Sequence, residues 1–225
     1  MAFINHIKPI NLYRYRSVAE LDREIRTIER HYLYCSHFED LNDPLEGHFR
    51  TSRQLRESGK HRAVREQIIG KKNELRICSF SEINNHHVMW AHYADQFRGI
   101  CVSYRLSRLL NGLGSRIEFT RMTYREKLPT VRESKRPREE AIRVLSSKHD
   151  RWAYENEWRM FSDSVETSYL EVDCVSRVFL GSRMEHDKKE RLTSKLKSLN
   201  ISVSEMQLRK YSIEFESIFE SRRRR

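Results

Sequence analysis

Short strand-like runs that alternate with helical periodicities limit most strongly how this chain can fold. Apolar residues recur at helical spacing at residues 18–28, where Ser17 is the expected N-cap, and at residues 192–199. We also expect a helix over residues 51–73 and a basic helix within residues 135–152. Strand-like apolar runs occupy residues 32–35, 75–80, 100–104, 117–124, 157–161 and 178–180. This order predicts the α+β class, with a mixed or antiparallel split sheet flanked by helices. We expect one domain over residues 1–221, followed by a basic tail at 222–225.

Composition narrows the class of protein further. The chain has 225 residues, of which 38% are hydrophobic and 10% aromatic, enough to bury a core. No apolar run is long enough to cross a membrane as a helix, and residues 1–10 lack the layout of a signal peptide. The four cysteines show neither metal-finger nor redox spacing, so we expect buried, reduced thiols in a cytoplasmic protein.

The charge is concentrated in parts of the chain. The formal net charge is +11. Residues 51–76 contribute +5, residues 105–151 contribute +7 and the tail contributes +4, whereas residues 152–176 sum to −5. The basic segments predict contacts with the phosphates of a nucleic acid. The alternative is that they form solvated faces without a partner.

Five local motifs stand out in a fixed order along the chain. The motifs are Leu12-Tyr13-Arg14-Tyr15-Arg16-Ser17, Leu41-Asn42-Asp43-Pro44 with Glu46, Ile77-Cys78-Ser79-Phe80-Ser81-Glu82, Met89-Trp90-Ala91-His92-Tyr93-Ala94 with Gly99, and Trp152-Ala153-Tyr154-Glu155-Asn156-Glu157-Trp158-Arg159. Together they resemble the bacterial family known as domain of unknown function 2971, over about residues 12–181. That family name carries no activity.

Three of these motifs are also similar to signatures of ADP-ribosyltransferase-like domains. The first is an arginine on the opening strand, the second is Ser79-Phe80-Ser81 and the third is Glu155-Asn156-Glu157, in that chain order. The residues around the third signature differ from the usual surround. The resemblance implies an ADP-ribosyltransferase-like split sheet and an enzyme that transfers ADP-ribose from NAD or cleaves NAD. It also implies a bacterial toxin or phage-defence effector that acts on nucleic acid or protein.

The chemistry of NAD cleavage assigns roles to the motif residues. The bond between nicotinamide and ribose breaks through an oxocarbenium-like transition state, which a fixed carboxylate stabilises. We expect Glu157 to be the catalytic carboxylate and Glu155, two residues earlier on the same strand face, to be its helper. An arginine, either Arg14 or Arg16, would grip the pyrophosphate in a forked geometry.

The remaining assignments follow from the same resemblance. No metal is expected, because the histidines lack the spacing of a metal site. The predicted substrate contacts are Asn42, Asp43, His92 and Arg159. The predicted contacts to the cofactor, with NAD acting as a substrate, are Arg14, Tyr15, Arg16, Ser79, Ser81, Trp90 and Tyr93.

Structural alternatives account for the same residues. Arg14 and Arg16 could pair with Glu157 and Glu155 in a network without catalysis. Glu155, Glu157 and Arg159 could form a cross-strand ladder of ion pairs. Two other functions stay open: a non-catalytic nucleic-acid-binding or interaction module, and a metal-dependent nuclease that uses Asp43, Glu46, Glu155 and Glu157.

Overall fold

The chain forms two compact units that are described separately. The computed structural model describes residues 8–112, 117–133, 135–168 and 174–222. Within these, the first unit contains residues 34–79, 117–133 and 135–167. The second unit contains residues 8–33, 80–112, 168 and 174–222. The chain passes between the units after residue 33, after residue 79, between residues 112 and 117, and after residue 167, so neither unit is a continuous segment.

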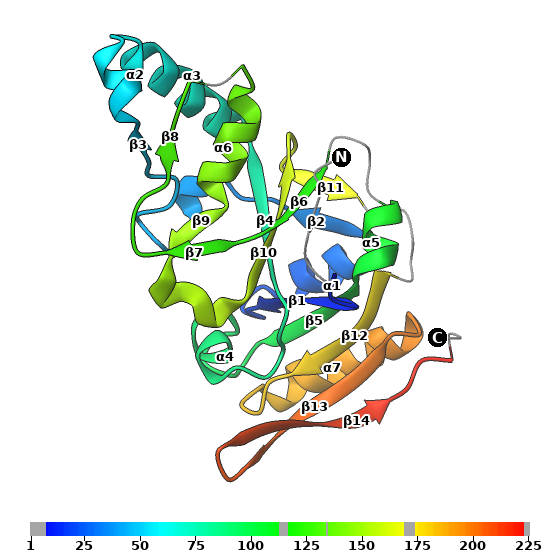
Figure 1. Ribbon diagram of the computed structural model, residues 1–225. Helices are drawn as coiled ribbons and strands as arrows, with labels where there is room; N and C mark the ends of the chain where they lie inside the picture. Colours follow the sequence, from blue (N-terminus) through cyan, green and yellow to red (C-terminus); the bar gives the residue numbers. More distant parts are fainter. Residues whose placement is uncertain (1–7, 113–116, 134, 169–173, 223–225) are drawn as a thin grey trace. The chain divides into compact units, whose positions relative to one another are not determined.

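The second unit is built on a sheet of mostly antiparallel strands (Figure 1). Its strand order is β14-β13-β12-β5-β1, and Ser81 at the end of β4 pairs with Tyr13 of β1. Strands β12 and β13 are parallel and the other pairs are antiparallel. The bounds are β1 Asn11–Arg16, β5 Ile100–Arg105, β12 Val175–Leu180, β13 Ser202–Arg209 and β14 Ser212–Phe219.

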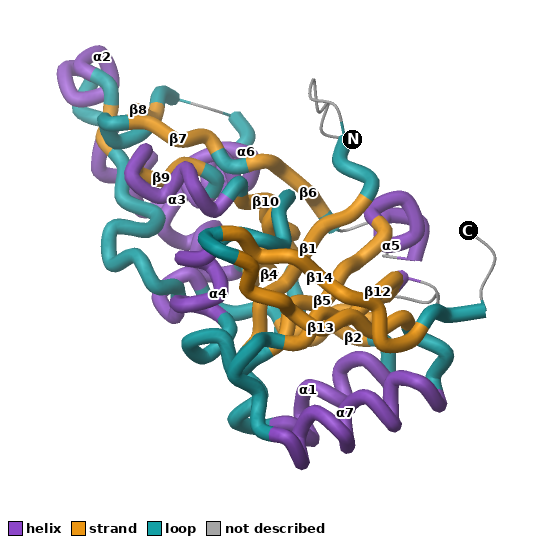
Figure 2. Tube along the Cα trace, turned by 90° about the horizontal axis from the view of Figure 1, so that it is seen from below, coloured by secondary structure: helices purple, strands orange, loops and turns teal. Residues whose placement is uncertain are grey.

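Helices complete the second unit. Figure 2 shows α1 (Leu21–Glu29) and α7 (His186–Ser198) side by side. Helix α7 also contacts β13. The periodic apolar residues bury one face of each helix, as the spacing predicts: Leu21 and Ile28 in α1, Leu192 and Leu196 in α7. Two shorter helices are α4 (His87–Tyr93) and α5 (Leu106–Gly112).

The chain leaves α4 through three consecutive left-handed residues. Asp95, Gln96 and Phe97 have φ angles of 47°, 51° and 70°, a region that side-chain-bearing residues rarely adopt. Backbone amides of this turn donate to carbonyl oxygens of α4, which would otherwise lack partners at the helix end. A Cβ atom at Gly99 would lie 2.2 Å from the carbonyl oxygen of Arg16. Only glycine fits there without moving the backbone.

The first unit combines sheet strands, two small parallel pairs and helices. Strand β4 (Arg76–Ser81) enters it with its first four residues, and the strand order is β4-β10-β6. The parallel pairs are β3–β8 and β7–β9. The strand bounds are β3 Arg50–Thr51, β6 Glu118–Arg121, β7 Thr123–Arg125, β8 Thr130–Val131, β9 Ser147–His149 and β10 Glu157–Ser162.

The helices of the first unit cover its apolar core. Helix α3 packs against α6, and both contribute to a cluster that includes Ile68, Val144, Leu145 and Phe161. Their bounds are α2 Arg53–Glu57, α3 His61–Glu74 and α6 Pro137–Leu145, with 3-10 turns at Phe38–Asp40 and Asp150–Glu155. Two short strands, β2 (Tyr32–Tyr34) and β11 (Glu166–Ser168), contain residues of both units.

The structure confirms the predicted α+β fold class and changes the bounds of some predicted elements. Mixed α and β structure, with mostly antiparallel pairing and flanking helices, is present. The predicted helix over 51–73 is broken at Gly59, whose φ is 74°. All four cysteines are buried, and none of them forms a disulfide bond. In the described residues, no helix has the length and apolarity to cross a membrane. The single domain and the finer likeness to ADP-ribosyltransferase-like domains stay predictions.

Candidate functional site

The predicted site residues are divided between the two units. Asn42, Asp43, Ser79, Glu155, Glu157 and Arg159 lie in the first unit. Arg14, Tyr15, Arg16, Ser81, Trp90, His92 and Tyr93 lie in the second. Only groups within one unit are described together below.

Arg159 is the centre of the predicted residues in the first unit. It lies on β10, where all six residues are buried, and 1% of its surface is exposed. Its guanidinium donates to both carboxylate oxygens of Glu46, at 2.6 and 2.9 Å, and to both of Glu157, at 2.7 and 3.1 Å. A fifth hydrogen bond, of 2.6 Å, goes to the carbonyl oxygen of Leu145. These bonds use all the N–H donors of an arginine, so none remains for a substrate.

Lys148 joins a second cation to the same carboxylates. Its ammonium lies 2.7 Å from Glu155, 3.5 Å from Glu46 and 3.6 Å from Glu157. It also lies 4.5 Å from the centre of the Trp152 ring, a cation–π distance. We call Glu46, Lys148, Glu155, Glu157 and Arg159 the ionic network. Its three carboxylates and two cations carry a formal charge of −1, all of it buried.

The network keeps its groups ionised in spite of burial. Burial alone would raise the pKa of Glu157, but the charges of Arg159 and Lys148 and hydrogen bonds from Arg159 and Ser79 lower it overall. Burial likewise opposes the charge of Lys148, yet Glu157 and Glu155 raise its pKa. The Tyr124 hydroxyl accepts the backbone N–H of Glu157 at 2.8 Å. Glu157 is therefore a fixed carboxylate that stays anionic.

A turn places Glu46 in the network. The Asp43 carboxylate accepts the backbone N–H of Leu45 at 2.9 Å, an Asx turn that the Asn-Asp-Pro sequence favours. Gly47 follows with φ 71°, and its carbonyl oxygen accepts a 2.7 Å hydrogen bond from the buried Lys72. Asp43 thus shapes the turn, whereas Asn42 is exposed.

The prediction that Glu155 and Glu157 alternate along one strand is wrong. Glu155 ends the 3-10 turn Asp150–Glu155, and β10 begins only at Glu157. Between them Asn156 has φ 44°, which turns the chain out of extended geometry. Both carboxylates nevertheless contact Lys148. The alternative in which Glu155, Glu157 and Arg159 form a cross-strand ladder of ion pairs is also wrong. Glu155 lies before β10, the strand that contains Glu157 and Arg159.

The nuclease alternative requires the buried carboxylates to hold a metal ion together. Glu46, Glu155 and Glu157 do converge, but Arg159 and Lys148 occupy the space between them. In the part of the chain that the structure describes, no group of three potential metal-ligating side chains is arranged to hold an ion.

A small pocket reaches the edge of the ionic network. Its volume is about 40 Å³, and it is bordered by Asp43, His48, Arg125, Lys148 and His149, among other residues. A pocket of this size admits water but no nicotinamide ring.

The predicted residues of the second unit have partners of their own. Arg16 forms a two-point ion pair with the buried Glu24, at 2.7 and 2.9 Å, so it does not need a carboxylate of the third signature. Arg14 lies over the Phe80 ring at 5.7 Å. Ser81 accepts the backbone N–H of Ile83 at 3.2 Å.

Tyr15 and Trp90 contribute to the core of the second unit. Their rings meet edge to face at 5.4 Å, and both side chains are buried. The Tyr15 hydroxyl donates to the Ile83 carbonyl at 2.9 Å, and the Trp90 indole N–H donates to the Asn84 carbonyl at 2.7 Å. On the same helix as Trp90, His92 is exposed and Tyr93 is partly exposed. Of the aromatic candidates, Tyr93 is therefore the more accessible.

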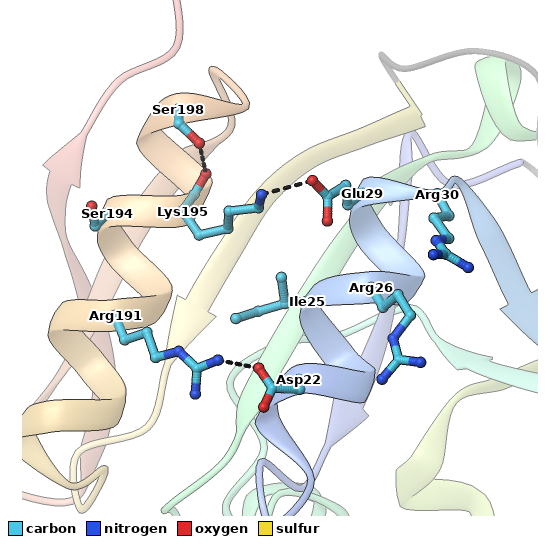
Figure 3. Close-up of a pocket in the computed structure, with 9 residues that line it drawn as sticks. All are labelled: Asp22, Ile25, Arg26, Glu29, Arg30, Arg191, Ser194, Lys195 and Ser198. Atoms are coloured by element: carbon cyan, nitrogen blue, oxygen red, sulfur yellow. Dashed lines mark hydrogen bonds and ion pairs between the residues drawn. The ribbon is translucent and has the colours of Figure 1, made fainter.

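A larger hollow lies between α1 and α7 (Figure 3). Its volume is about 730 Å³, and ion pairs cross it between Asp22 and Arg191 and between Glu29 and Lys195. Such exposed pairs hold the two helices together weakly. Two more arginines line the hollow, Arg26 in α1 and Arg30 directly after it.

Sequence reasoning missed two members of the ionic network. The sequence places Lys148 only in a basic segment, and it gives Glu46 a role only in the nuclease alternative. Glu46 stands within the Asn-Asp-Pro motif, which was a usable signal. Nothing in the sequence around Lys148 indicates that it faces Glu155.

One comparison with known proteins gives a match over part of the chain. The family model described as Protein of unknown function (DUF2971) matches residues 89–160. The match includes the Trp90 and Glu157 motifs, while the motifs before residue 89 lie outside it. Searches of the curated proteins and of the solved structures found no match.

Proposed function

We propose that the chain, whose residues 89–160 match the family model described as Protein of unknown function (DUF2971), is an NAD-dependent enzyme that transfers ADP-ribose or cleaves NAD. One observation carries the proposal: the Ser79 side chain is hydrogen-bonded to Glu157. This bond joins the second and third signatures, which are far apart in the sequence, within the first unit. A toxin or phage-defence role belongs to the same proposal.

The proposed step needs a carboxylate of this kind. The bond between the ribose C1′ and the nicotinamide nitrogen breaks, and nicotinamide leaves with the electron pair. Positive charge develops on the ribose, where the anionic Glu157 stabilises it. An acceptor oxygen, from water or a hydroxyl group, then bonds to C1′ and loses its proton. Arg159 is a positioning residue, because all its donors are used within the protein.

The two arginines predicted to grip the pyrophosphate, Arg14 and Arg16, differ in their contacts. Arg16 is held at both ends of its fork by Glu24. Arg14 lies over the Phe80 ring, so the choice between the two arginines stays a prediction. Because the pocket at Lys148 is only about 40 Å³, NAD binding must open the first unit beside the ionic network.

Two isosteric variants test the proposal. Glu157→Gln and Glu46→Gln each neutralise one buried carboxylate on Arg159, so their effects on folding should be similar. Glu157→Gln should abolish nicotinamide release from NAD, whereas Glu46→Gln should keep a measurable rate. NAD should raise the melting temperature of the wild type. If nicotinamide release is absent from the wild type, or if the folded variants lose it equally, the proposal is overturned.

The internal pairing of the charges in the ionic network favours a second function. Every charge in the network is paired within the protein, as a purely structural element would require. Helix α3 meanwhile exposes Arg62 and Arg65, the latter over the Phe49 ring. We propose non-catalytic nucleic-acid binding as the alternative. Lys72 and Lys148 are buried and do not take part.

The salt dependence of the affinity for nucleic acid distinguishes nucleic-acid binding from the proposed NAD chemistry. Binding to duplex or single-stranded nucleic acid should weaken steeply as salt rises, and Arg62→Gln with Arg65→Gln should lower that slope. Glu157→Gln should leave this binding unchanged. A slope unaffected by the α3 variants would exclude α3 as the contact surface.

A further inference from the structure

A second pocket, in the second unit, shares no residue with the ionic network or with the predicted site. Its volume is about 450 Å³, within the range of about 300–1,000 Å³ usual for small-ligand sites. The walls come from β1, β5, α5, β12, the first residue of β13 and the two residues that follow β14. Strands β1, β5 and β12 are neighbours in the sheet (Figure 1).

Positive charge predominates on these walls. Arg105, Arg108 and Arg177 line the pocket, and Glu220 is its acidic residue. Arg177 is already bound to Glu220 through two contacts of 2.6 and 2.7 Å. Within the described residues, the side chain of Arg105 has no hydrogen bond or ion pair. This part of the pocket therefore offers a forked donor to an anion.

Aromatic surface and polar groups lie beside the arginines. The rings of Tyr13 and Phe179 are 6.2 Å apart and both line the pocket. The Ser176 hydroxyl donates to the Ser103 hydroxyl at 2.8 Å. Burial raises the pKa of Tyr13, while hydrogen bonds with Asn11 and Ser103 oppose the rise, so the phenol stays neutral at physiological pH.

One polar atom in the pocket lacks a partner. The side-chain oxygen Oδ1 of Asn11 is buried and accepts no hydrogen bond from the described residues. A buried acceptor without a donor costs free energy, so it indicates a group that the protein itself does not supply. A ligand N–H at this position would satisfy it.

We propose that this pocket binds a free nucleoside monophosphate whose base carries an amino group. The phosphate lies at Arg105 and Arg108, the base lies against Tyr13 and Phe179, and its amino N–H donates to Asn11 Oδ1. Cytidine and adenosine monophosphates fit this description. Uridine monophosphate does not, because it presents a carbonyl oxygen where cytidine presents an amino group.

Calorimetric titration of the full chain with these mononucleotides tests the proposal. Cytidine monophosphate should bind about tenfold more tightly than uridine monophosphate, the worth of one satisfied hydrogen bond. Asn11→Ala should remove most of that difference. Arg105→Gln should weaken the binding of each mononucleotide by about tenfold or more, since it removes a charged contact. Arg209→Gln, which changes an exposed arginine outside the pocket, should have no effect.

Several outcomes would overturn the proposal. One is the absence of binding by every mononucleotide at millimolar concentration. Another is equal affinity for inorganic phosphate, which would make the pocket a simple anion site. A third is tighter binding of an oligonucleotide that both Arg105→Gln and Arg209→Gln weaken alike, because that pattern reports surface charge. None of these readouts involves nicotinamide release, so they are independent of the proposed enzyme.

Discussion

Arg159 and Arg105 lie in opposite electrostatic settings in the two units. Arg159 is 1% exposed and donates to two carboxylates and a carbonyl oxygen, all from its own unit. Arg105 lines a 450 Å³ pocket and has no side-chain partner among the described residues. The first arginine is committed to the fold, whereas the second is available to a ligand. The comparison teaches that a motif residue and a binding residue need not be the same.

Removing Arg159 should have the largest effect. Arg159→Met leaves Glu46 and Glu157 buried without their main partner, so we expect a loss of about 3–5 kcal/mol in the free energy of unfolding. Urea denaturation followed by circular dichroism measures it. Arg138→Met, at a partly exposed ion pair with Glu118, should cost about 1 kcal/mol or less. Equal losses in both variants would refute the special role of the network.

Acid should weaken the network by a smaller amount. The pKa of Glu157 is lowered in the folded protein, so its contribution is complete above the unfolded pKa, near 4.5, and is lost as pH falls through the folded pKa. A protonated carboxyl still hydrogen-bonds, so the loss is less than in Arg159→Met.

The comparison of Glu157→Gln with the wild type isolates this titration. The gap between their melting temperatures should be widest near neutral pH and should narrow below pH 4.5. Glu133→Gln, at an exposed ion pair with Lys60, should follow the wild type throughout. A constant gap across this range would show that Glu157 carries no stabilising charge.

The turn that places Glu46 should also be sensitive. Gly47 has φ 71°, and a Cβ there would lie 2.7 Å from Nζ and Cε of the buried Lys72. Gly47→Ala should therefore cost about 1–2 kcal/mol, the usual penalty for a left-handed residue with a side chain. Gly70→Ala, in the middle of α3 with open space around it, should instead add roughly 1 kcal/mol. Differential scanning calorimetry should show shifts of opposite sign.

Arg105→Gln should have the smallest effect on stability. With no side-chain partner to lose, the free energy of unfolding should change by about 0.5 kcal/mol or less. Its effect on mononucleotide binding, in contrast, should be large. A strongly destabilised Arg105→Gln would place this arginine in the same class as Arg159.

The sequence patterns predict which helices and strands exist better than they predict where these elements begin and end. The periodicity of Leu21 and Ile28 gave a helix, but that helix starts at Leu21 rather than after Ser17, whose hydroxyl accepts a hydrogen bond from Ala19. The basic helix expected within residues 135–152 runs from Pro137 to Leu145, and β9 pairs with β7 from Ser147 onward. Such endings depend on tertiary partners that one sequence does not display.

The same dependence on tertiary partners explains which site residues could be predicted from the sequence. Glu157 and Ser79 were recognisable because each stands in a compact local motif. The pocket of the second unit was not recognisable, because Arg105 and Arg177 come from β5 and β12. Only the strand register, in which Arg177 pairs with Ser103, brings those walls together.

The interleaving of the two units along the chain restricts how evolution can rearrange this protein. Residues 34–79 and 117–167 of one unit are separated in the gene by codons for the other. A single recombination breakpoint within residues 34–167 therefore divides the first unit, and no uninterrupted exon-like segment encodes either unit alone. Shuffling should transfer the ionic network and the arginine-lined pocket together or not at all, so their histories are linked even though their residues are distinct.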